Sequence, residues 1–299
     1  MVSRLILSVL VTTTIVARVQ GDLAGLHFYL YTKGNTNAVE IKASDANTIN
    51  NSAFVVGQPV KFLCHGYTSS YTAEFPRDLK NSEKFGNILI QFLLHTKENC
   101  GISSSLLEPS EPLKLQCYRG RLGGTILAGG RLRRSLCKHS PRRERNCKLD
   151  EDVDRHSLGG QVGAFITPNL DNGDKIPRVT GLDPARPGFE QATTSPSERL
   201  DPTDADFVDV IRTSTGAGST STTADPPGAG TVDFYPNGGV KQPGFTTTVG
   251  FKAYKCTSYA DFQGSCPKTN GVLMGEYVPK TISGTYYLST KSFAPFAKR

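Results

Sequence analysis

The sequence predicts an α/β fold in which strands and helices are mixed. Its 299 residues suffice for one large α/β domain or for two small ones. A buried strand is expected over 60–64, and Ser157, which has Gly159 and Gly160 shortly after it, precedes an apolar helical segment. Strand-like runs with aromatic residues recur toward the C-terminus, over 231–239, 250–259 and 284–292.

The first residues predict a secretory signal peptide over 1–21. Arg4 is followed by an apolar run over 5–17 and then by small residues, so cleavage is expected between Ala17 and Gly21. An N-terminal membrane anchor is the alternative, although the run is short for a membrane span. No later segment is long and apolar enough to cross a bilayer. We therefore expect a secreted, extracellular protein with a mature chain over 22–299 and no transmembrane segment.

The expected regularity differs along the chain. Strands and turns are expected over 23–85, and the strand over 60–64 ends in His65-Gly66-Tyr67. The segment 87–155 is rich in Ser, Leu, Gly and Arg, and it has no sustained helix or strand period. Order is expected again from Ser157 onward, apart from a Gly-, Ser- and Thr-rich surface loop over 214–230. We therefore predict that 87–155 is irregular or poorly ordered.

The cysteines agree with an extracellular protein. There are seven, which is an odd number, so at least one is left over after pairing. Four of them fall within 87–155. Cys256 and Cys266 bracket a short loop and are the best local pair for a disulfide. The sequence Asn50-Asn51-Ser52 is an acceptor sequon, which predicts glycosylation at Asn50.

The net charge of +7 comes from one segment. Residues 119–148 contain ten Lys or Arg and one acid, a net charge of +9, so the rest of the chain sums to 7 − 9 = −2. A basic patch can bind nucleic acid or an anionic surface. The segment lacks matching aromatic residues, and the chain is predicted to be secreted. We therefore expect no nucleic-acid partner.

Ser157 raises the main functional question. The run Arg155-His156-Ser157-Leu158-Gly159 matches the nucleophile pattern G-x-S-x-G except at its first position. Such an elbow needs a buried apolar strand before it, whereas 150–155 is charged, and we expect the desolvation cost to exclude this run from a central strand. Taken alone, the residues favour a serine at a helix N-terminus over a working nucleophile or a relic of one.

Eight stretches resemble the pancreatic lipase family of secreted lipases and phospholipases A1, in particular its insect members. They occur in family order and cover most of 25–86 and 156–297. The stretches are HFYLYTKGN, PVKFLCHGYTSS, HSLGGQVGAFI, VTGLDPARPGFE, RLDPTDADFVDVI, TVDFYPNGG, YKCTSYADFQGSC and YYLSTKSFAPFA. The resemblance implies an α/β-hydrolase fold that hydrolyses carboxylic esters, with acylglycerols or phospholipids as substrate and a lipid surface as partner.

The resemblance also assigns roles to residues. Ser157 matches the nucleophile, and Asp183 matches the acid that orients the base. The backbone N–H groups of Tyr67 and Leu158 match the oxyanion hole, which stabilises the charge of the tetrahedral intermediate. Without the resemblance, Asp183 could equally cap a turn that precedes Pro184.

A calcium loop of some family members has a partial match in Arg199, Asp201 and Asp204. The alternative, which the residues favour, is that Asp201 and Asp204 are a carboxylate pair at a helix N-terminus. Calcium is the one cofactor that the resemblance suggests, and no other is expected.

The chain also departs from the family. Its five histidines are His27, His65, His95, His139 and His156, so none follows Asp183, where the general base belongs in chain order. The segment 87–155 does not match the family, and the chain has no Trp. These departures lead to the hypothesis of a shifted reading frame or an altered splice, and to the expectation of an incomplete fold with impaired catalysis. The alternative function is that of an inactive lipid-binding or yolk-type storage protein.

Overall fold

The computed structural model describes residues 26–32, 34–42, 45–54, 60–66, 69–81, 88–94, 151–162, 164, 167, 175–186, 189, 194–215, 228–240, 242 and 250–292. Its strands are β1 (Leu26–Thr32), β2 (Asn35–Ile41), β3 (Val60–Cys64), β4 (Ile88–Leu94), β5 (Glu151–His156), β6 (Arg178–Leu182), β7 (Val208–Ile211), β8 (Val232–Pro236), β9 (Lys252–Lys255), β10 (Val272–Leu273) and β11 (Gly284–Leu288). The helices include α2 (Ala46–Asn50), α3 (Glu74–Asn81), α5 (Leu158–Gln161) and α7 (Tyr259–Gln263), with the 3-10 turns η5 (Pro196–Glu198) and η6 (Asn237–Gly239).

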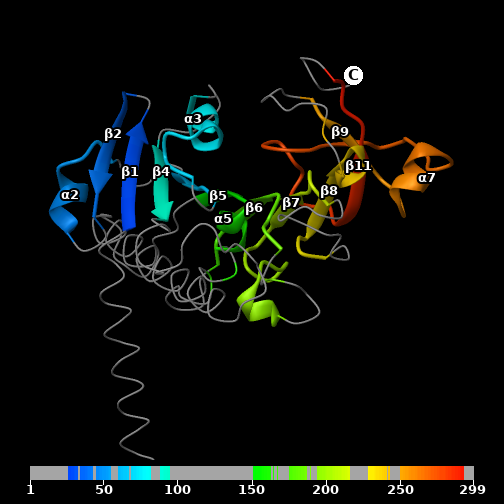
Figure 1. Cartoon of the computed structure of the whole chain (residues 1–299), viewed down its shortest axis with the longest axis horizontal. Coiled ribbons are helices and arrows are strands. Elements are labelled where there is room, and N and C mark those ends of the chain that lie inside the picture. The colour runs from blue at the N-terminus through cyan, green and yellow to red at the C-terminus, as the bar shows by residue number, and fades with distance from the viewer. Residues whose placement is uncertain are drawn as a thin grey trace, which may run out of the picture.

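One mixed sheet contains all of these strands, in the order β10-β9-β11-β8-β7-β6-β5-β3-β4-β1-β2 (Figure 1). From β4 through β3, β5, β6, β7 and β8 to β11, neighbouring strands run parallel. The outer strands pair antiparallel, β1 with β2 and β4, and β9 with β10 and β11. Within the parallel part, the order β4-β3-β5-β6-β7-β8 exchanges β3 and β4 and is otherwise sequential, as in the α/β-hydrolase fold, so the predicted fold class is confirmed.

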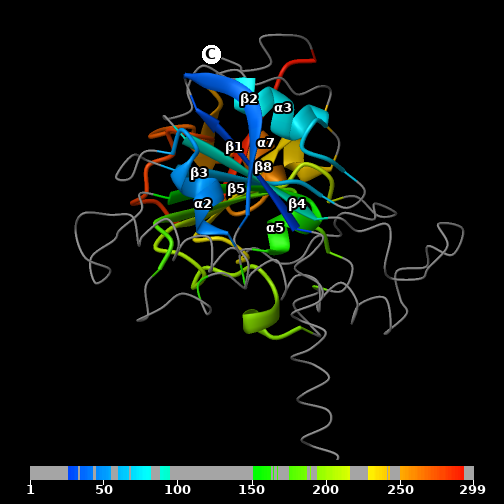
Figure 2. The same ribbon diagram turned by 90° about the vertical axis from the view of Figure 1, so that its left-hand side faces the viewer.

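The central strands β3, β6, β7 and β8 are buried on both faces, as parallel strands usually are. All five residues of β3 are buried, which confirms the strand expected over 60–64. Phe62 packs in a core cluster with Leu158 of α5, whereas Leu63 packs with Leu79 of α3. Because successive side chains of a strand point to opposite faces, α3 and α5 cover opposite faces of the sheet (Figure 2).

The charged run before Ser157 forms β5 in the middle of the sheet, so the expectation that it could not be a central strand is wrong. The register places Asp152 beside Lys61 on β3 and beside Arg178 on β6. Lys61 and Arg178 on these neighbouring strands are buried cations. The expectation treated the acids alone, without the neighbours that only the register supplies.

The prediction that 87–155 is irregular is also wrong at the other end of that segment, because 88–94 form β4. Residues 95–150 lie outside the described residues, and so does the predicted signal peptide over 1–21. No helix in the described ranges has the length and apolar character that a membrane crossing requires.

The predicted disulfide between Cys256 and Cys266 is confirmed, with a distance of 5.8 Å between the two Cα atoms. The two cysteines pack against Phe262 of α7 in a small aromatic cluster. Asn50 is the exposed last residue of α2, so its side chain is accessible. Glycosylation of Asn50 stays a prediction.

Candidate active site

Ser157 occupies the turn between β5 and α5 in a conformation that few non-glycine residues adopt. Its backbone has φ 57° and ψ −121°, and its side chain makes no capping hydrogen bond. Such backbone strain costs on the order of 1–3 kcal/mol and persists only where the surrounding structure enforces it. The interpretation of Ser157 as an ordinary helix cap is therefore wrong, because a capping serine has extended backbone and bonds the first turn. A strained serine between a strand and a helix is the geometry of a nucleophile elbow.

Three backbone hydrogen bonds hold this turn. The N–H of Ser157 donates to the carbonyl of Leu182 at 3.0 Å. The carbonyl of Ser157 accepts from the N–H groups of Gly160 and Ala185, each at 2.9 Å. The strained residue is thus fixed both to its own helix and to the segment that follows β6.

Close packing at the elbow requires glycine at two positions. A Cβ at Gly159 would lie 2.5 Å from the carbonyl oxygen of Cys64 and 2.7 Å from that of His65. A Cβ at Gly66 would lie 2.8 Å from the Cβ of Ser157. The sequence predicted the need for small residues after Ser157, and Gly66 supplies the same freedom from the neighbouring strand end.

Asp183 lies directly after β6, next to Ser157. The register pairs His156 with Leu182, so the residues that follow these two, Ser157 and Asp183, reach the same edge of the sheet. Asp183 is buried and has a φ of 48°. Its Oδ1 accepts hydrogen bonds from the N–H groups of Thr213 at 3.1 Å and Ser214 at 3.2 Å.

These two N–H donors were not predicted from the sequence. Thr213 and Ser214 follow β7, and no side-chain pattern marks a residue that acts through its backbone N–H. The only available signal was their position just after a predicted strand, at the edge where the carboxyl ends of parallel strands meet. Backbone donors stabilise the ionised carboxylate and fix its orientation.

His156 lies beside Ser157 on the chain and packs its ring against Phe75 of α3, with centroids 5.3 Å apart. Part of the residue is exposed, yet the protein around the ring removes much of its hydration. This burial lowers the pKa of His156 below the ordinary 6.5, and the nearby charge of Asp183 raises it in part. No hydrogen bond joins the ring to Ser157 or Asp183 in the described part of the chain.

His65 is the other histidine near this edge, and its ring is engaged elsewhere. It is fully buried after β3, and its Nδ1 lies 2.8 Å from the carbonyl oxygen of Gly66. Because a carbonyl can only accept, this contact places the proton on Nδ1. The contact supports a structural role at the strand end.

The segment after β8 has amide side chains where the general base would be expected. Gln242 donates through Nε2 to the carbonyls of Thr213 at 3.1 Å and Pro236 at 2.9 Å. Asn237 donates through Nδ2 to Gln242 Oε1 at 3.0 Å and to the Thr290 hydroxyl at 2.7 Å. An amide does not accept a proton near neutral pH, so none of these groups can serve as the base.

The predicted oxyanion hole is only partly within the described residues. Leu158 is the buried first residue of α5, directly after Ser157, so its N–H lies at the start of the helix. Tyr67 lies outside the described residues. The role of these two backbone groups stays a prediction.

The predicted calcium loop lies between η5 and β7. Asp201 and Asp204 are buried, and Arg199 is half-buried beside them. Asp201 Oδ1 accepts from the N–H and the hydroxyl of Thr203, each at 2.6 Å, and Asp204 Oδ2 accepts from the N–H of Asp201 at 2.8 Å. Calcium takes about six to eight oxygen ligands. Both carboxylates are used within their own turn, so the contacts fit a turn-stabilising pair better than an ion site.

Comparison with known proteins places this site in context. The family model described as Lipase matches residues 153–250, which include Ser157 and Asp183. Pancreatic lipase-related protein 2 of Cavia porcellus is 28% identical over 313 residues, which cover 91% of this chain and 65% of that protein. Hepatic triacylglycerol lipase of Mus musculus is 48% identical over 89 residues, which cover 30% of this chain and 17% of that protein.

A third relative has a similar coverage. Inactive pancreatic lipase-related protein 1 of Homo sapiens is 28% identical over 337 residues, which cover 92% of this chain and 65% of that protein. The chain thus spans about two thirds of the length of the pancreatic relatives it matches, 65% in two of these comparisons.

Proposed function

Because this chain belongs to the pancreatic lipase family, we propose that it is a secreted carboxylic ester hydrolase of low activity that acts on acylglycerols or phospholipids. Ser157 is the nucleophile and Asp183 is the acid of the site. The low activity follows from the missing histidine. The protein therefore meets lipid surfaces and turns over their esters slowly.

The observation that carries this proposal is the backbone of Ser157. Its φ of 57° and ψ of −121° are maintained by three backbone hydrogen bonds and by the absence of a side chain at Gly159 and Gly66. This conformation is unfavourable for serine and serves no capping function. It does present a hydroxyl at the sheet edge, beside the Asp183 carboxylate that accepts two backbone hydrogen bonds.

The attack of Ser157 on the ester needs a general base, and this chain has no histidine in the position for that role. When Ser157 Oγ bonds to the ester carbonyl carbon, its proton must leave, and the carbonyl electron pair moves to the oxygen. In a complete triad an imidazole takes that proton and later gives it to the leaving alcohol. Water must replace the imidazole here. Loss of general-base catalysis reduces the rate by about 10²–10⁴-fold.

The second candidate is a lipid-binding protein that hydrolyses nothing. The absence of any histidine after Asp183 favours it, and the name of one relative calls that relative inactive. In this case the elbow persists because it packs the fold, and the function lies in binding a lipid surface.

Ester hydrolysis by the purified chain separates the two candidates. A short-chain nitrophenyl ester and phospholipid vesicles are incubated at pH 7–9 with the parent protein and with Ser157→Ala. We expect slow product release from the parent that Ser157→Ala abolishes, while sedimentation with the vesicles is the same for both proteins. The variant removes only the hydroxyl, so it keeps the elbow and any lipid-binding surface.

Two other outcomes contradict the proposal, the first by excluding hydrolysis and the second by excluding low activity. Identical rates for parent and Ser157→Ala, with vesicle sedimentation intact, would show a binding protein. Turnover comparable to that of an active lipase, abolished by Ser157→Ala, would show that a base is present. If the His65→Ala variant also lost this turnover, His65 would be that base.

A further inference from the structure

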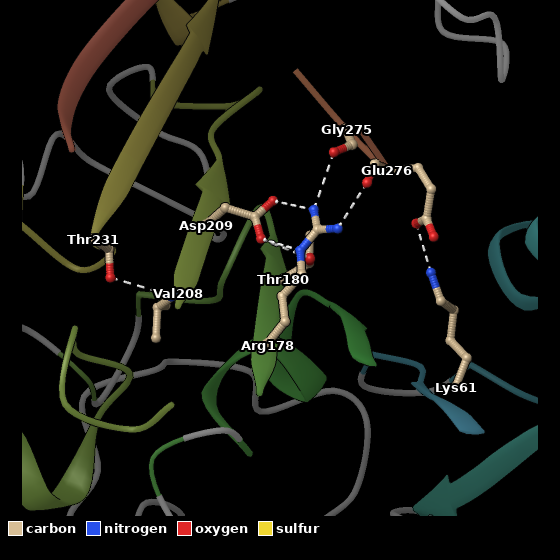
Figure 3. Close-up of polar contacts among 8 residues, drawn as sticks. All are labelled: Lys61, Arg178, Thr180, Val208, Asp209, Thr231, Gly275 and Glu276. Atoms are coloured by element: carbon tan, nitrogen blue, oxygen red, sulfur yellow. Dashed lines mark hydrogen bonds and ion pairs between the residues drawn. The ribbon is translucent and has the colours of Figure 1, made fainter. Parts of the chain in front are cut away.

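A buried charge pair joins β6 to β7 far from Ser157. Arg178 contacts Asp209 through two nitrogens, with Nε 2.8 Å from Oδ1 and Nη2 2.9 Å from Oδ2. The side chains are 3% and 0% exposed. Asp209 Oδ1 also accepts from the Thr180 hydroxyl at 2.9 Å, so two residues of β6 bond one carboxylate of β7 (Figure 3).

A loop from the C-terminal part of the chain fixes the guanidinium from the other side. Arg178 donates through Nη2 to the carbonyl of Gly275 at 3.0 Å and through Nη1 to that of Glu276 at 3.1 Å. The Glu276 carboxylate in turn pairs with Lys61 Nζ at 2.6 Å (Figure 3). The orientation of Arg178 is thus set by four hydrogen bonds, two to β7 and two to the loop at 275–276.

The carboxyl ends of β6 and β7, opposite to the Arg178–Asp209 pair, hold Asp183. Arg178 begins β6 and Asp183 follows its end, while Asp209 lies near the start of β7 and Thr213 and Ser214 follow its end. The register pairs Thr180 with Asp209 and Leu182 with Ile211. A slip of one residue would move the two N–H donors by about 3.3 Å along the strand, beyond hydrogen-bond reach of Asp183.

We propose that Arg178 and Asp209 are positioning residues that act on Asp183 by fixing the register of β6 against β7. The proposal rests on the assigned role of Asp183 as the acid of the site. Val179, Val208 and Val210 of these strands pack in a core cluster, and such apolar contacts are not directional. A two-pronged buried ion pair satisfies both partners in one register only.

The experiment replaces both charges at once by apolar side chains of similar length, Arg178→Met with Asp209→Leu. Such a replacement of a buried ion pair is often neutral for stability, so the midpoint of thermal unfolding is expected to stay near that of the parent. Hydrogen exchange is measured at the amides of Thr213 and Ser214 in the full chain. We expect their exchange to speed up by roughly tenfold or more, because each amide would lose a hydrogen bond to a charged acceptor.

A matched control removes a different ion pair of the same network. Lys61→Met with Glu276→Gln leaves the β6–β7 contact intact, and the exchange of the Thr213 and Ser214 amides is expected to match that of the parent. Parent-like exchange at these two amides in the Arg178→Met and Asp209→Leu variant would overturn the proposal. Equal acceleration at every core amide would also overturn it, because that pattern reports general destabilisation.

Arg178→Lys decides the matter if the double variant does not fold. Lysine keeps the charge but cannot form the two-pronged contact. We expect faster exchange at Thr213 and Ser214 than elsewhere in the sheet, and unchanged exchange at both amides would contradict the proposal. Because exchange needs no ester hydrolysis, a chain that proves inactive on every ester would reject the proposed function without deciding this test.

Discussion

The carboxyl ends of β5 and β6 differ sharply from the end of β8. At the first two, Ser157 is held in strained backbone by three hydrogen bonds, and Asp183 is held by two N–H groups. After β8, Asn237 and Gln242 bond carbonyls and a hydroxyl, and no described side chain there accepts a proton. The ends of β5 and β6 have the geometry of a nucleophile elbow beside a carboxylate. The end of β8 has only packing and amide hydrogen bonds.

The two regions differ in what holds them in place. The elbow is part of the sheet, since a larger residue at Gly159 would collide with the backbone of β3 and the residue after it. The strained turn therefore belongs to the packing of the sheet. After β8, the Gln242 side chain donates to two backbone carbonyls, contacts that involve no proton transfer.

The largest expected effect comes from a substitution in the first region, at Gly159. Gly159→Ala places a Cβ against two backbone oxygens, which cannot move away as a side-chain tip can. We expect a loss of about 3 kcal/mol in the free energy of unfolding, the upper end for overpacking. Urea unfolding measures it. Gly34→Ala is the matched control, because nothing lies within 4 Å of its Cβ. A loss in Gly159→Ala no larger than in Gly34→Ala would contradict the account of the elbow.

A smaller effect is expected in the second region. Gln242→Ala removes the donor to Thr213 and Pro236 and the acceptor for Asn237. We expect a loss of about 1–2 kcal/mol in unfolding free energy, since the site is partly exposed and water can replace some of these bonds. The rate of ester hydrolysis should fall by less than the rate in Ser157→Ala. A fall as large as in Ser157→Ala would place Gln242 in the chemistry.

The smallest effect concerns the pH dependence of stability. Burial lowers the pKa of His156 in the folded chain, so the unfolded chain binds the proton more readily. Stability from this residue is present above about pH 6.5 and is lost as pH falls below that value toward the folded pKa. Unfolding free energies at pH 5, 6, 7 and 8 should therefore fall less on acidification in His156→Gln than in the parent. Parallel curves for the two proteins would refute this.

The sequence predicted those features that local residue types determine. The buried strand over 60–64, the glycines after Ser157 and the disulfide between Cys256 and Cys266 each follow from a short stretch. The resemblance to the family then predicted the fold, and the roles of Ser157 and Asp183 stay predictions.

The remaining features depend on partners that are distant in sequence. The central place of β5 depends on its register with β3 and β6, which pairs Asp152 with Lys61 and with Arg178. The hydrogen bonds to the Asp183 carboxylate come from the backbone N–H groups of Thr213 and Ser214, which no side-chain pattern predicts. Sequence reasoning also judged the desolvation of β5 without its neighbours, and so it rejected a strand that the fold contains.

The central claim is that the site lacks only its base. Ser157 and Asp183 stand at one sheet edge, and the described carboxylate contacts use Oδ1 of Asp183. A small diffusible imidazole can supply the missing general base to such a pair. Its own reaction with the ester sets a background, which Ser157→Ala measures.

The decisive measurement is therefore hydrolysis of a short-chain nitrophenyl ester at pH 7–9 over a range of imidazole concentrations, for the parent, Ser157→Ala and Asp183→Asn. The account predicts a low parent rate without imidazole. It also predicts a saturable rise with imidazole that Ser157→Ala lacks and Asp183→Asn weakens. A parent rate that never exceeds the Ser157→Ala background would contradict it, and so would a high Ser157-dependent rate with no imidazole present.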